Sequence, residues 1–393
     1  MKQFVKLKPK KEVFVMRKHP WVFSGAIAEY ADGLEEGMVV AVLDHQGSQL
    51  AMGHYQEGSI RVRLLHHGVA ERPDDFWTSA IQRAYDTRQI ILQSLSASTN
   101  TYRLVHGAGD LLPGLVIDIY SQLAVVQCHS MGMYHERQAI AEALKAVYGD
   151  QLQHIYLRAR KTLPQRFAEE VFDGFLHGNS AEAEVLENGH RFQINAATGQ
   201  KTGFFLDQRD NRSLLAQYAV GKTVLNTFCY TGGFSIYALQ AGAKQVTSVD
   251  ISGKAMELTA NNVVLNGFNA EQHVGVTADV LKYLRKVEEL FDIVVVDPPA
   301  YAKSYNKRHR AVQGYKRLNA EAIKRVKPGG LLFTFSCSQV VDRQLFQDTI
   351  VAAGLEAGRS ARVLHQLTQA PDHPVNLFHP EGAYLKGLVV QFD

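Results

Sequence analysis

The sequence predicts a multidomain α/β protein with a small β domain, an α+β middle domain and a C-terminal parallel sheet covered by helices. Three observations support this prediction. The chain has 393 residues, which is too long for one ordinary domain. Short alternating strands punctuated by glycine fill the first 70 residues. From about residue 186, apolar strands alternate with helix-length segments, a pattern typical of parallel sheets.

The first domain is predicted to span residues 1–70. Residues 39–55 contain two apolar runs on either side of the polar turn DHQGS, which indicates a β-hairpin. Residues 59–65 alternate between apolar and polar side chains and predict the next strand. Glycines recur at turn-like intervals, so the strands should be short.

The middle domain is predicted to span residues 73–185. Residues 73–92 have a helical period and begin with Pro73 and Asp74, a plausible helix start. Strands separated by Gly/Pro turns are expected within 101–129, followed by a helix over 135–149. Residues 154–160 predict a further strand, so this part of the chain mixes helices and strands.

The third domain is predicted to span residues 186–393. Its apolar strands are 222–228, 244–250, 291–297 and 330–336, with a strand-like lead-in at 187–195. Parallel sheets of this kind bind ligands at the carboxyl ends of their strands. The functional residues should therefore follow directly after each strand.

Composition and cysteine content exclude several classes of protein. Hydrophobic residues make up 46% and charged residues 21%, as in soluble globular proteins. There is no apolar run of eighteen residues and no signal-peptide pattern, so no membrane association is expected. The three cysteines, Cys128, Cys229 and Cys337, form no CxxC pair. We therefore expect neither a disulfide framework nor a metal site, and a reducing cytoplasmic location.

A nucleoside-binding site is predicted at the tips of the strands 222–228 and 244–250 and of a further strand that ends before Asp279. The segment CYTGGFSIYAL places Gly232 and Gly233 between a strand and a helix, where backbone can approach a ligand. This spacing matches neither GxGxxG nor a P-loop. Asp250 ends the next strand and could accept both ribose hydroxyls, and Asp279 could meet an adenine amino group. Taken singly, each Asp is better explained as a helix N-cap, but their positions at successive strand tips favour a nucleoside site.

The strand 291–297 ends in the most distinctive motif, FDIVVVDPPAYAKS. Asp297 lies at the end of this apolar strand. Pro298 and Pro299 stiffen the backbone and lack N–H donors, so the following loop presents fixed carbonyls. A simple turn is the alternative reading, but the place of the motif at a strand tip favours function.

Positive charge is concentrated in two segments although the net charge is only +3. Residues 1–20 hold seven Lys or Arg and one Glu, and residues 301–327 hold nine and one Glu. Such clusters can neutralise phosphates, or can simply form solvated basic faces.

Taken together, the motifs resemble those of class I S-adenosylmethionine methyltransferases, and the whole chain resembles the bacterial 23S rRNA cytosine carbon-5 methyltransferases of the RlmI type. The stretches that carry this resemblance are RKHPWVFSGAI (17–27), RLVHGAGDLLPGLVID (103–118), GQKTGFFLDQRDNR (199–212), VLNTFCYTGGFS (224–235), DPPAYAKS (297–304) and FTFSCS (333–338).

The resemblance implies a PUA-like N-terminal RNA-binding domain and a Rossmann-like methyltransferase domain with a mostly parallel seven-stranded sheet. It implies S-adenosylmethionine as cofactor. Asn226 stands where many methyltransferases carry Asp or Glu, so Asp207 or Asp297 could supply the missing negative charge. The residues implied to bind the cofactor are Phe204, Asp207, Arg209, Asn226, Tyr230, Gly232, Asp250, Asp279, Asp297 and Pro298.

Cys337 is predicted to be a catalytic nucleophile. Carbon-5 of a pyrimidine is a poor nucleophile, and a thiolate that adds to carbon-6 activates it. Cys337 follows the strand 330–336, near the same sheet edge as Asp297, and the basic segment between them would favour a thiolate. A small buried cysteine is the alternative for Cys337. Cys128 is expected to pack in an apolar core, and Cys229 is not expected to be catalytic.

Asp297 is also predicted to be catalytic, by holding the cytosine and protonating its nitrogen-3. A related group of RNA cytosine methyltransferases carries a second cysteine where this chain has Ala300. The base that removes the carbon-5 proton therefore stays open between Tyr301, Lys303 and Asp207.

RNA is the expected partner, either 23S rRNA or the assembling large ribosomal subunit, and a homodimer would suit the family. Arg17 and Lys18 could bind phosphates while Trp21 stacks on a base. At least one of Trp21 and Phe23 is expected to pack in the small core instead. The further candidates for RNA contact are Lys303, Lys307, Arg308 and Arg310.

Two alternative functions remain open from sequence. An rRNA methyltransferase acting on a purine ring nitrogen or an exocyclic amine would need no cysteine, although the aromatic residue sits one position too late after DPP for the simplest amine site. A non-catalytic ribosome-assembly factor could retain the cofactor fold. Binding of S-adenosylmethionine and dependence on Cys337 distinguish these possibilities.

Overall fold

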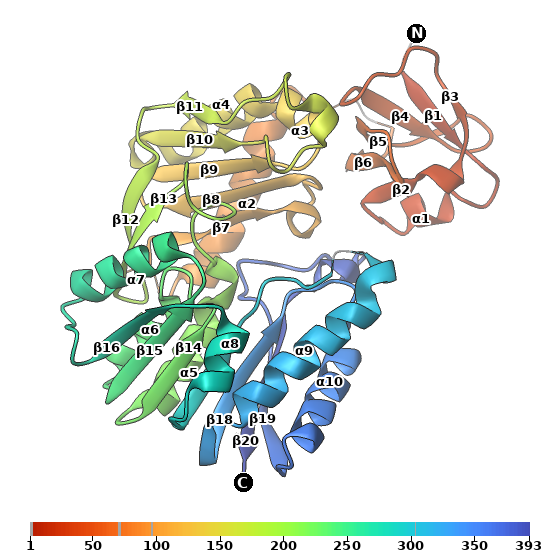
Figure 1. Cartoon of the computed structure of the whole chain (residues 1–393). Coiled ribbons are helices and arrows are strands. Elements are labelled where there is room, and N and C mark those ends of the chain that lie inside the picture. The colour runs from red at the N-terminus through yellow and green to blue at the C-terminus, as the bar shows by residue number, and fades with distance from the viewer. Residues whose placement is uncertain (1–2, 70–71, 96, 303) are drawn as a thin grey trace. The chain divides into compact units, whose positions relative to one another are not determined.

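The structure is a computed structural model that describes residues 3–69, 72–95, 97–302 and 304–393. Figure 1 shows the chain, which contacts divide into two compact units. The first unit contains Met1–Asn188, Ile194–Phe204 and Pro371–Gly382. The second contains Gly189–Gln193, Phe205–Ala370 and Ala383–Asp393. The boundaries that we predict near residues 70 and 186 remain a proposal.

A six-stranded sheet forms the N-terminal part of the first unit. Its strand order is β2-β6-β5-β4-β1-β3. The predicted hairpin is formed by antiparallel pairing of β4 with β5, and a core of alternating side chains such as Val5, Val40 and Val62 fills the interior. The elements are β1 (Phe4–Leu7), α1 (Val13–Met16), β2 (Trp21–Phe23), β3 (Ile27–Tyr30), β4 (Val39–Leu43), β5 (Gln49–Tyr55) and β6 (Ile60–His67).

A five-stranded sheet with order β11-β10-β9-β8-β7 forms the rest of the first unit. The predicted second helix begins at Arg137, and a separate short helix precedes it because Ser130 caps the backbone of Met133. The elements are α2 (Phe76–Leu92), β7 (Thr101–His106), β8 (Leu115–Tyr120), β9 (Leu123–Cys128), α3 (Met131–His135), α4 (Arg137–Tyr148), β10 (His154–Arg158) and β11 (Gly174–His177). The hairpin of β12 (Glu182–Glu187) and β13 (His190–Asn195) follows.

The segment 371–382 belongs to the first unit although it lies late in the chain. The backbone N–H of Arg103 donates to the Asp372 carboxylate at 3.0 Å, and the Arg88 guanidinium donates to the Asp372 carbonyl at 2.9 Å. Our sequence-based division assigned this segment to the third domain with its neighbours.

A seven-stranded, mostly parallel sheet forms the second unit, as predicted. Its order is β16-β15-β14-β17-β18-β20-β19, and β20 runs antiparallel to both β18 and β19. The strands are β14 (Thr223–Thr227), β15 (Gln245–Asp250), β16 (His273–Thr277), β17 (Phe291–Val296), β18 (Val326–Ser336), β19 (Ala361–Leu367) and β20 (Lys386–Phe392).

Helices cover this sheet, and Figure 1 shows α9 and α10 running side by side. Tyr315 and Leu318 of α9 and Phe346 of α10 share one core with Val294 and Leu332 of the sheet. The helices are α5 (Arg209–Ala219), α6 (Gly233–Gln240), α7 (Gly253–Leu265), α8 (Val280–Lys286), α9 (Arg308–Ile323) and α10 (Arg343–Glu356). Among the described residues, none of the helices combines the length and apolar character that crossing a membrane requires.

The parallel register brings the predicted functional residues to one edge. Thr227 pairs with Val249 and with Val296, and Val296 pairs with Thr334. The carboxyl ends of these strands therefore lie at the same edge, where Asp250, Asp297 and Cys337 follow or end them.

Candidate active site

The loop between β14 and α6 is held in a strained conformation. Phe228, Tyr230 and Gly232 all have positive φ angles, of 57°, 49° and 79°. The Asp250 carboxylate accepts the N–H of Tyr230 at 3.1 Å, and the Thr259 hydroxyl donates to the Tyr230 carbonyl at 2.8 Å. Strain of this kind persists where the surroundings over-determine the backbone, as at ligand sites.

Gly232 is required by this loop, and we expect Gly232→Ala to disrupt it. A Cβ atom there would lie 2.8 Å from Thr259 Cγ2, and the backbone already has φ +79°. The left-handed conformation and the clash together should lower the free energy of unfolding by about 1–3 kcal/mol and weaken binding of the cofactor. Thermal unfolding and calorimetric titration with S-adenosylmethionine measure both effects.

Gly221→Ala provides the matched control for this prediction. Gly221 also has a positive φ of 69°, but nothing lies within 4 Å of its added Cβ. This variant should show the backbone cost alone and bind the cofactor normally. Wild-type affinity in Gly232→Ala would contradict a role of this glycine in the site.

Asn226 offers a buried acceptor beneath the glycine loop. Its side-chain N–H donates to Ser235 Oγ at 2.8 Å, and a chain of hydrogen bonds continues through Ser248 to His273. Burial lowers the pKa of His273 to about 4, so this network is neutral at pH 7. Among the described residues, Asn226 Oδ1 has no hydrogen-bond partner. A buried acceptor left free in this way fits a donor such as the ammonium of a methionine moiety.

The two predicted nucleoside-binding aspartates differ in their local roles. Asp250 is partly buried, and its carboxylate accepts the N–H groups of Tyr230 and Ser252, which fixes it at the tip of β15. Ser252, not Asp250, caps α7. Asp279 is exposed and caps α8 by accepting the N–H of Lys282 at 2.9 Å. The N-cap alternative therefore holds for Asp279, and its contact with adenine stays a prediction.

The segment before α5 places a second group of polar side chains in the second unit. Asp207 is buried, and its Oδ2 accepts the Tyr384 hydroxyl at 2.6 Å. Arg209 is also buried, with its Nε 3.4 Å from Asp210. Phe204 belongs to the first unit, where it is buried and its N–H donates to the Tyr120 hydroxyl at 3.2 Å, so its predicted cofactor contact remains untested.

Asp297 follows β17 and is held by Gln208, a residue that no sequence motif singles out. Gln208 Nε2 donates to Asp297 Oδ2 at 3.0 Å, and Asn211 Nδ2 donates to Gln208 Oε1 at 2.6 Å. Pro298 is buried directly after it. The unusual segment 199–212 contains Gln208 and could have pointed to it. Its partner Asp297, however, is 89 residues away in the sequence.

Cys337 differs from the other two cysteines. It is partly exposed, whereas Cys128 and Cys229 are buried. Removal from water raises the pKa of both buried thiols to about 12. This difference agrees with the prediction that Cys128 packs in a core and that Cys229 is not the nucleophile.

A buried hydrogen-bond network links the loops that carry Asp297 and Cys337. Ser338, directly after Cys337, shares a hydrogen bond of 3.1 Å with the Tyr315 hydroxyl, and its Oγ accepts the N–H of Ala302 at 3.5 Å. The Tyr315 ring packs 4.6 Å from the Tyr301 ring. The loop after β17 and the loop after β18 are therefore tied together.

The predicted RNA-contacting residues are mostly exposed. Arg17 and Lys18 are exposed, as are Lys307 and Arg310, while Arg308 is partly buried and pairs with Asp342 at 3.1 Å. Lys303 lies outside the described residues. Further along the basic segment 301–327, Lys316 pairs with Glu356 and Lys327 with Asp292. These two lysines are therefore engaged in ion pairs within the protein.

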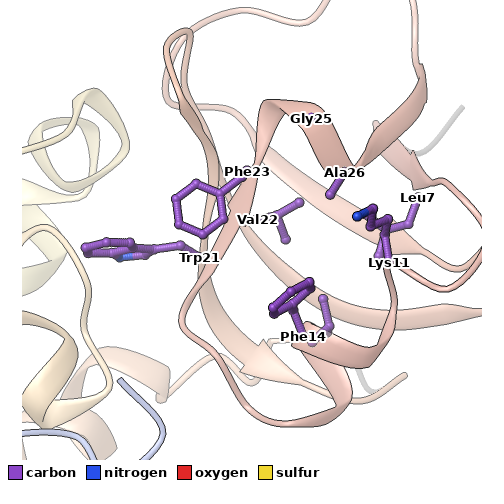
Figure 2. Close-up of a pocket in the computed structure, with 9 residues that line it drawn as sticks. Leu7, Lys11, Phe14, Trp21, Val22, Phe23, Gly25 and Ala26 are labelled. Carbon is purple, nitrogen blue, oxygen red and sulfur yellow. The ribbon is translucent and has the colours of Figure 1, made fainter. Parts of the chain in front are cut away.

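An apolar hollow of about 260 Å³ opens beside β2 in the N-terminal sheet. Figure 2 shows Phe14, Phe23 and Lys11 around it. Phe14 and Phe23 are 51% and 43% exposed, and Trp21 packs 4.2 Å from the His379 ring. The expectation that Trp21 or Phe23 fills the small core is wrong, because Val22 between them takes that place.

Comparisons with known proteins agree with this geometry. Residues 102–389 match the family model of S-adenosylmethionine-dependent methyltransferases, and residues 5–67 match that of PUA-like domains. The chain is 39% identical, over the full length of both chains, to Ribosomal RNA large subunit methyltransferase I of Tolumonas auensis. It is 40% identical, over 98% of both chains, to the protein of the same name from Alteromonas mediterranea.

The fold also occurs in a solved structure. "A putative sam-dependent methyltransferase from Streptococcus mutans" superimposes with a TM-score of 0.84 at 24% identity, covering 100% of each chain. The free Asn226 acceptor and the glycine loop fit the cofactor that the family model names. The chain therefore belongs to the S-adenosylmethionine-dependent methyltransferases, in the family of ribosomal RNA large subunit methyltransferase I with an N-terminal PUA-like domain, and its cofactor is S-adenosylmethionine.

Proposed function

We propose that this enzyme methylates carbon-5 of a cytosine in the RNA of the large ribosomal subunit, through a covalent bond to Cys337. The relatives at 38–40% identity are named for large-subunit ribosomal RNA. One observation carries the choice of carbon-5. The partly exposed Cys337 follows β18 at the sheet edge where Asp297 follows β17, and their loops are tied by Ser338 and Tyr315.

These residues can carry out the reaction in three steps. The Cys337 thiolate adds to carbon-6, while Asp297 gives a proton to nitrogen-3, so that electron density builds at carbon-5. S-adenosylmethionine supplies the electrophilic methyl group that carbon-5 accepts. A base then removes the carbon-5 proton, Asp297 recovers the nitrogen-3 proton, and the carbon–sulfur bond breaks to restore the thiolate.

The three candidates for the final base are not equivalent. Burial, with smaller contributions from Tyr315 and Asp279, raises the pKa of Tyr301 to about 12. Its phenol is therefore neutral at pH 7 and is a poor base. Asp207 accepts a hydrogen bond from the Tyr384 hydroxyl, which holds its carboxylate in one orientation. We therefore favour Asp207 over Tyr301, and Lys303 lies outside the described residues.

The N-terminal domain supplies RNA contacts in this proposal. Exposed Phe14 and Phe23 border the apolar hollow, and an unstacked base can pack against such rings. Lys11 lines the same hollow, while Arg17 and Lys18 are exposed nearby in the chain and suit phosphates. Trp21 remains a candidate for stacking through the part of its ring that His379 leaves uncovered.

Neutralising Arg17 and Lys18 together should weaken RNA binding with a reduced salt dependence. Each lost phosphate contact lowers the slope of log affinity against log salt by about 0.7–0.9. We expect the double alanine variant to lose about 1.5 from this slope, measured by fluorescence anisotropy with an rRNA fragment. Lys222→Ala with Lys244→Ala is the matched control, since both lysines are exposed at the amino ends of β14 and β15. Equal slopes in the two double variants would exclude these contacts.

The proposed reaction is tested by identifying its product. The full chain is incubated with labelled S-adenosylmethionine and unmodified large-subunit rRNA, and the digested nucleosides are separated. The proposal predicts labelled 5-methylcytidine. A labelled purine, or label on an exocyclic amine, would show that the enzyme acts on another atom, and the absence of any label on naked rRNA and on assembling subunits would refute the proposed substrate.

A further inference from the structure

Lys386 is a buried cation next to the proposed nucleophile. It opens β20 and pairs with Ser336 in the antiparallel ladder, so it lies opposite the residue before Cys337. Only 5% of Lys386 is exposed. Its Nζ donates to the carbonyls of Ser338 and Val341, each at 2.6 Å. The ammonium therefore holds the turn that directly follows Cys337 in place through two hydrogen bonds.

This ammonium forms no ion pair with a carboxylate among the described residues. Asp342 is the acid that faces it, but Asp342 accepts the N–H of Leu345 and pairs with Arg308. A buried charge without an ionic partner is costly and is retained where it serves the site. Burial lowers the pKa of Lys386 to about 8, and the charge of Cys337 acts in the opposite direction.

We propose that Lys386 is a positioning residue for the reaction, whose ammonium fixes the turn 338–341 behind Cys337 and stabilises Cys337 as the thiolate. This inference rests on the proposed function of Cys337. A positive charge next to a thiol favours the ionised form, which is the nucleophile. No step consumes Lys386, since its proton stays on Nζ throughout.

Among the described residues, α9 and the start of α10 bring further charged and titratable groups to this place. Tyr315 of α9 faces Cys337 and is held neutral by burial, which raises its pKa. Asp342 and Arg343 at the start of α10 both face Lys386 and carry opposite charges. The opposite charges of Asp342 and Arg343 largely offset each other. We therefore attribute the electrostatic effect on the Cys337 thiol to the buried ammonium of Lys386.

The test measures the rate at which iodoacetamide alkylates Cys337 as a function of pH, with the modified peptide identified by mass spectrometry. Cys128 and Cys229 are buried and should react slowly. Lys386→Gln retains a hydrogen-bond donor and removes the charge, whereas Lys386→Arg retains the charge. Lys327→Gln is the control, because Lys327 lies near the other end of β18, roughly 30 Å along the strand from Cys337.

In Lys386→Gln, the midpoint of the pH profile should rise by about one pH unit, which leaves about tenfold less thiolate at pH 7. Lys386→Arg should restore most of the difference, and Lys327→Gln should match wild type. An unchanged midpoint in a folded Lys386→Gln protein would overturn the proposal. If that variant does not fold, the wild-type protein still decides: its native midpoint should lie below that of the same cysteine in urea, and a native midpoint equal or higher rejects the proposal.

This measurement separates the two proposals because it needs neither RNA nor methyl transfer. If Cys337→Ala remains active while Lys386→Gln shifts the alkylation profile, the covalent mechanism fails and the pairing of Lys386 with Cys337 stands. If Cys337→Ala is inactive while the profile does not move, the covalent mechanism stands and Lys386 has no electrostatic role.

Discussion

Cys337→Ala is expected to reduce methyl transfer by at least about a thousandfold while leaving the affinity for S-adenosylmethionine unchanged. In the proposed reaction, carbon-5 has no other means of activation once the thiolate is removed. The hydrogen bonds that hold the cofactor loop join Asp250 and Thr259 to Tyr230, and Asn226 to Ser235. Single-turnover rates and calorimetric titration measure the two quantities separately.

Trapping the covalent adduct between enzyme and RNA complements the loss of activity expected in Cys337→Ala. RNA in which the target cytosine carries fluorine at carbon-5 cannot release a proton there, so the adduct with the enzyme should persist through denaturing electrophoresis. The adduct should form with wild type and with Cys229→Ala, since Cys229 is buried against Met256 and Thr259. It should be missing in Cys337→Ala. An adduct in that variant, or undiminished methylation, would show that another residue or another mechanism operates.

The sequence predicted the parallel sheet, and the common edge at which Asp297 and Cys337 lie, because both depend on local patterns. An apolar strand followed by Asp297, or by Cys337, can be recognised without knowing its neighbours. Parallel order then brings all such tips together, as the pairing of Val296 with Thr334 confirms. The helix over 73–92 was likewise visible from its period, although it begins at Phe76.

The partners of these residues could not be predicted, because they come from distant parts of the chain. Gln208 reaches Asp297 across 89 residues, Tyr384 reaches Asp207 across 177, and Lys386 reaches Ser338 across 48. A lysine at the start of a strand carries no local sign that it will be buried. Only the position of β20 beside β18 reveals it.

Charge clusters were also ambiguous from sequence for a physical reason. The basic segment 301–327 could bind phosphates or form internal ion pairs. The acids that pair with Lys316 and Lys327 are Glu356 and Asp292, both outside that segment. In the structure, the later lysines of the segment form ion pairs, whereas Lys307 and Arg310 near its beginning are exposed.

Asp297→Asn should lower the turnover of the bound complex by about 100- to 10,000-fold, the range of a lost general acid. The side chain keeps its size, and a rotated amide can still accept the hydrogen bond from Gln208, so the loop should keep its position. Affinity for S-adenosylmethionine should change little. Burst-phase kinetics with saturating cofactor isolates the chemical step from binding.

Gln208→Ala tests a smaller change at the same site. It leaves the carboxyl group of Asp297 in place and removes only the hydrogen-bond donor that orients it. One lost hydrogen bond to the neutral carboxylic acid that donates the proton is worth about 0.5–1.5 kcal/mol, so the turnover should fall by about 2- to 13-fold. If Asp297→Asn instead weakens cofactor binding and spares the chemical step, Asp297 serves the cofactor and another group protonates nitrogen-3. If both variants lose turnover in the expected order, the hydrogen bond from Gln208 sets the orientation that the proton transfer needs.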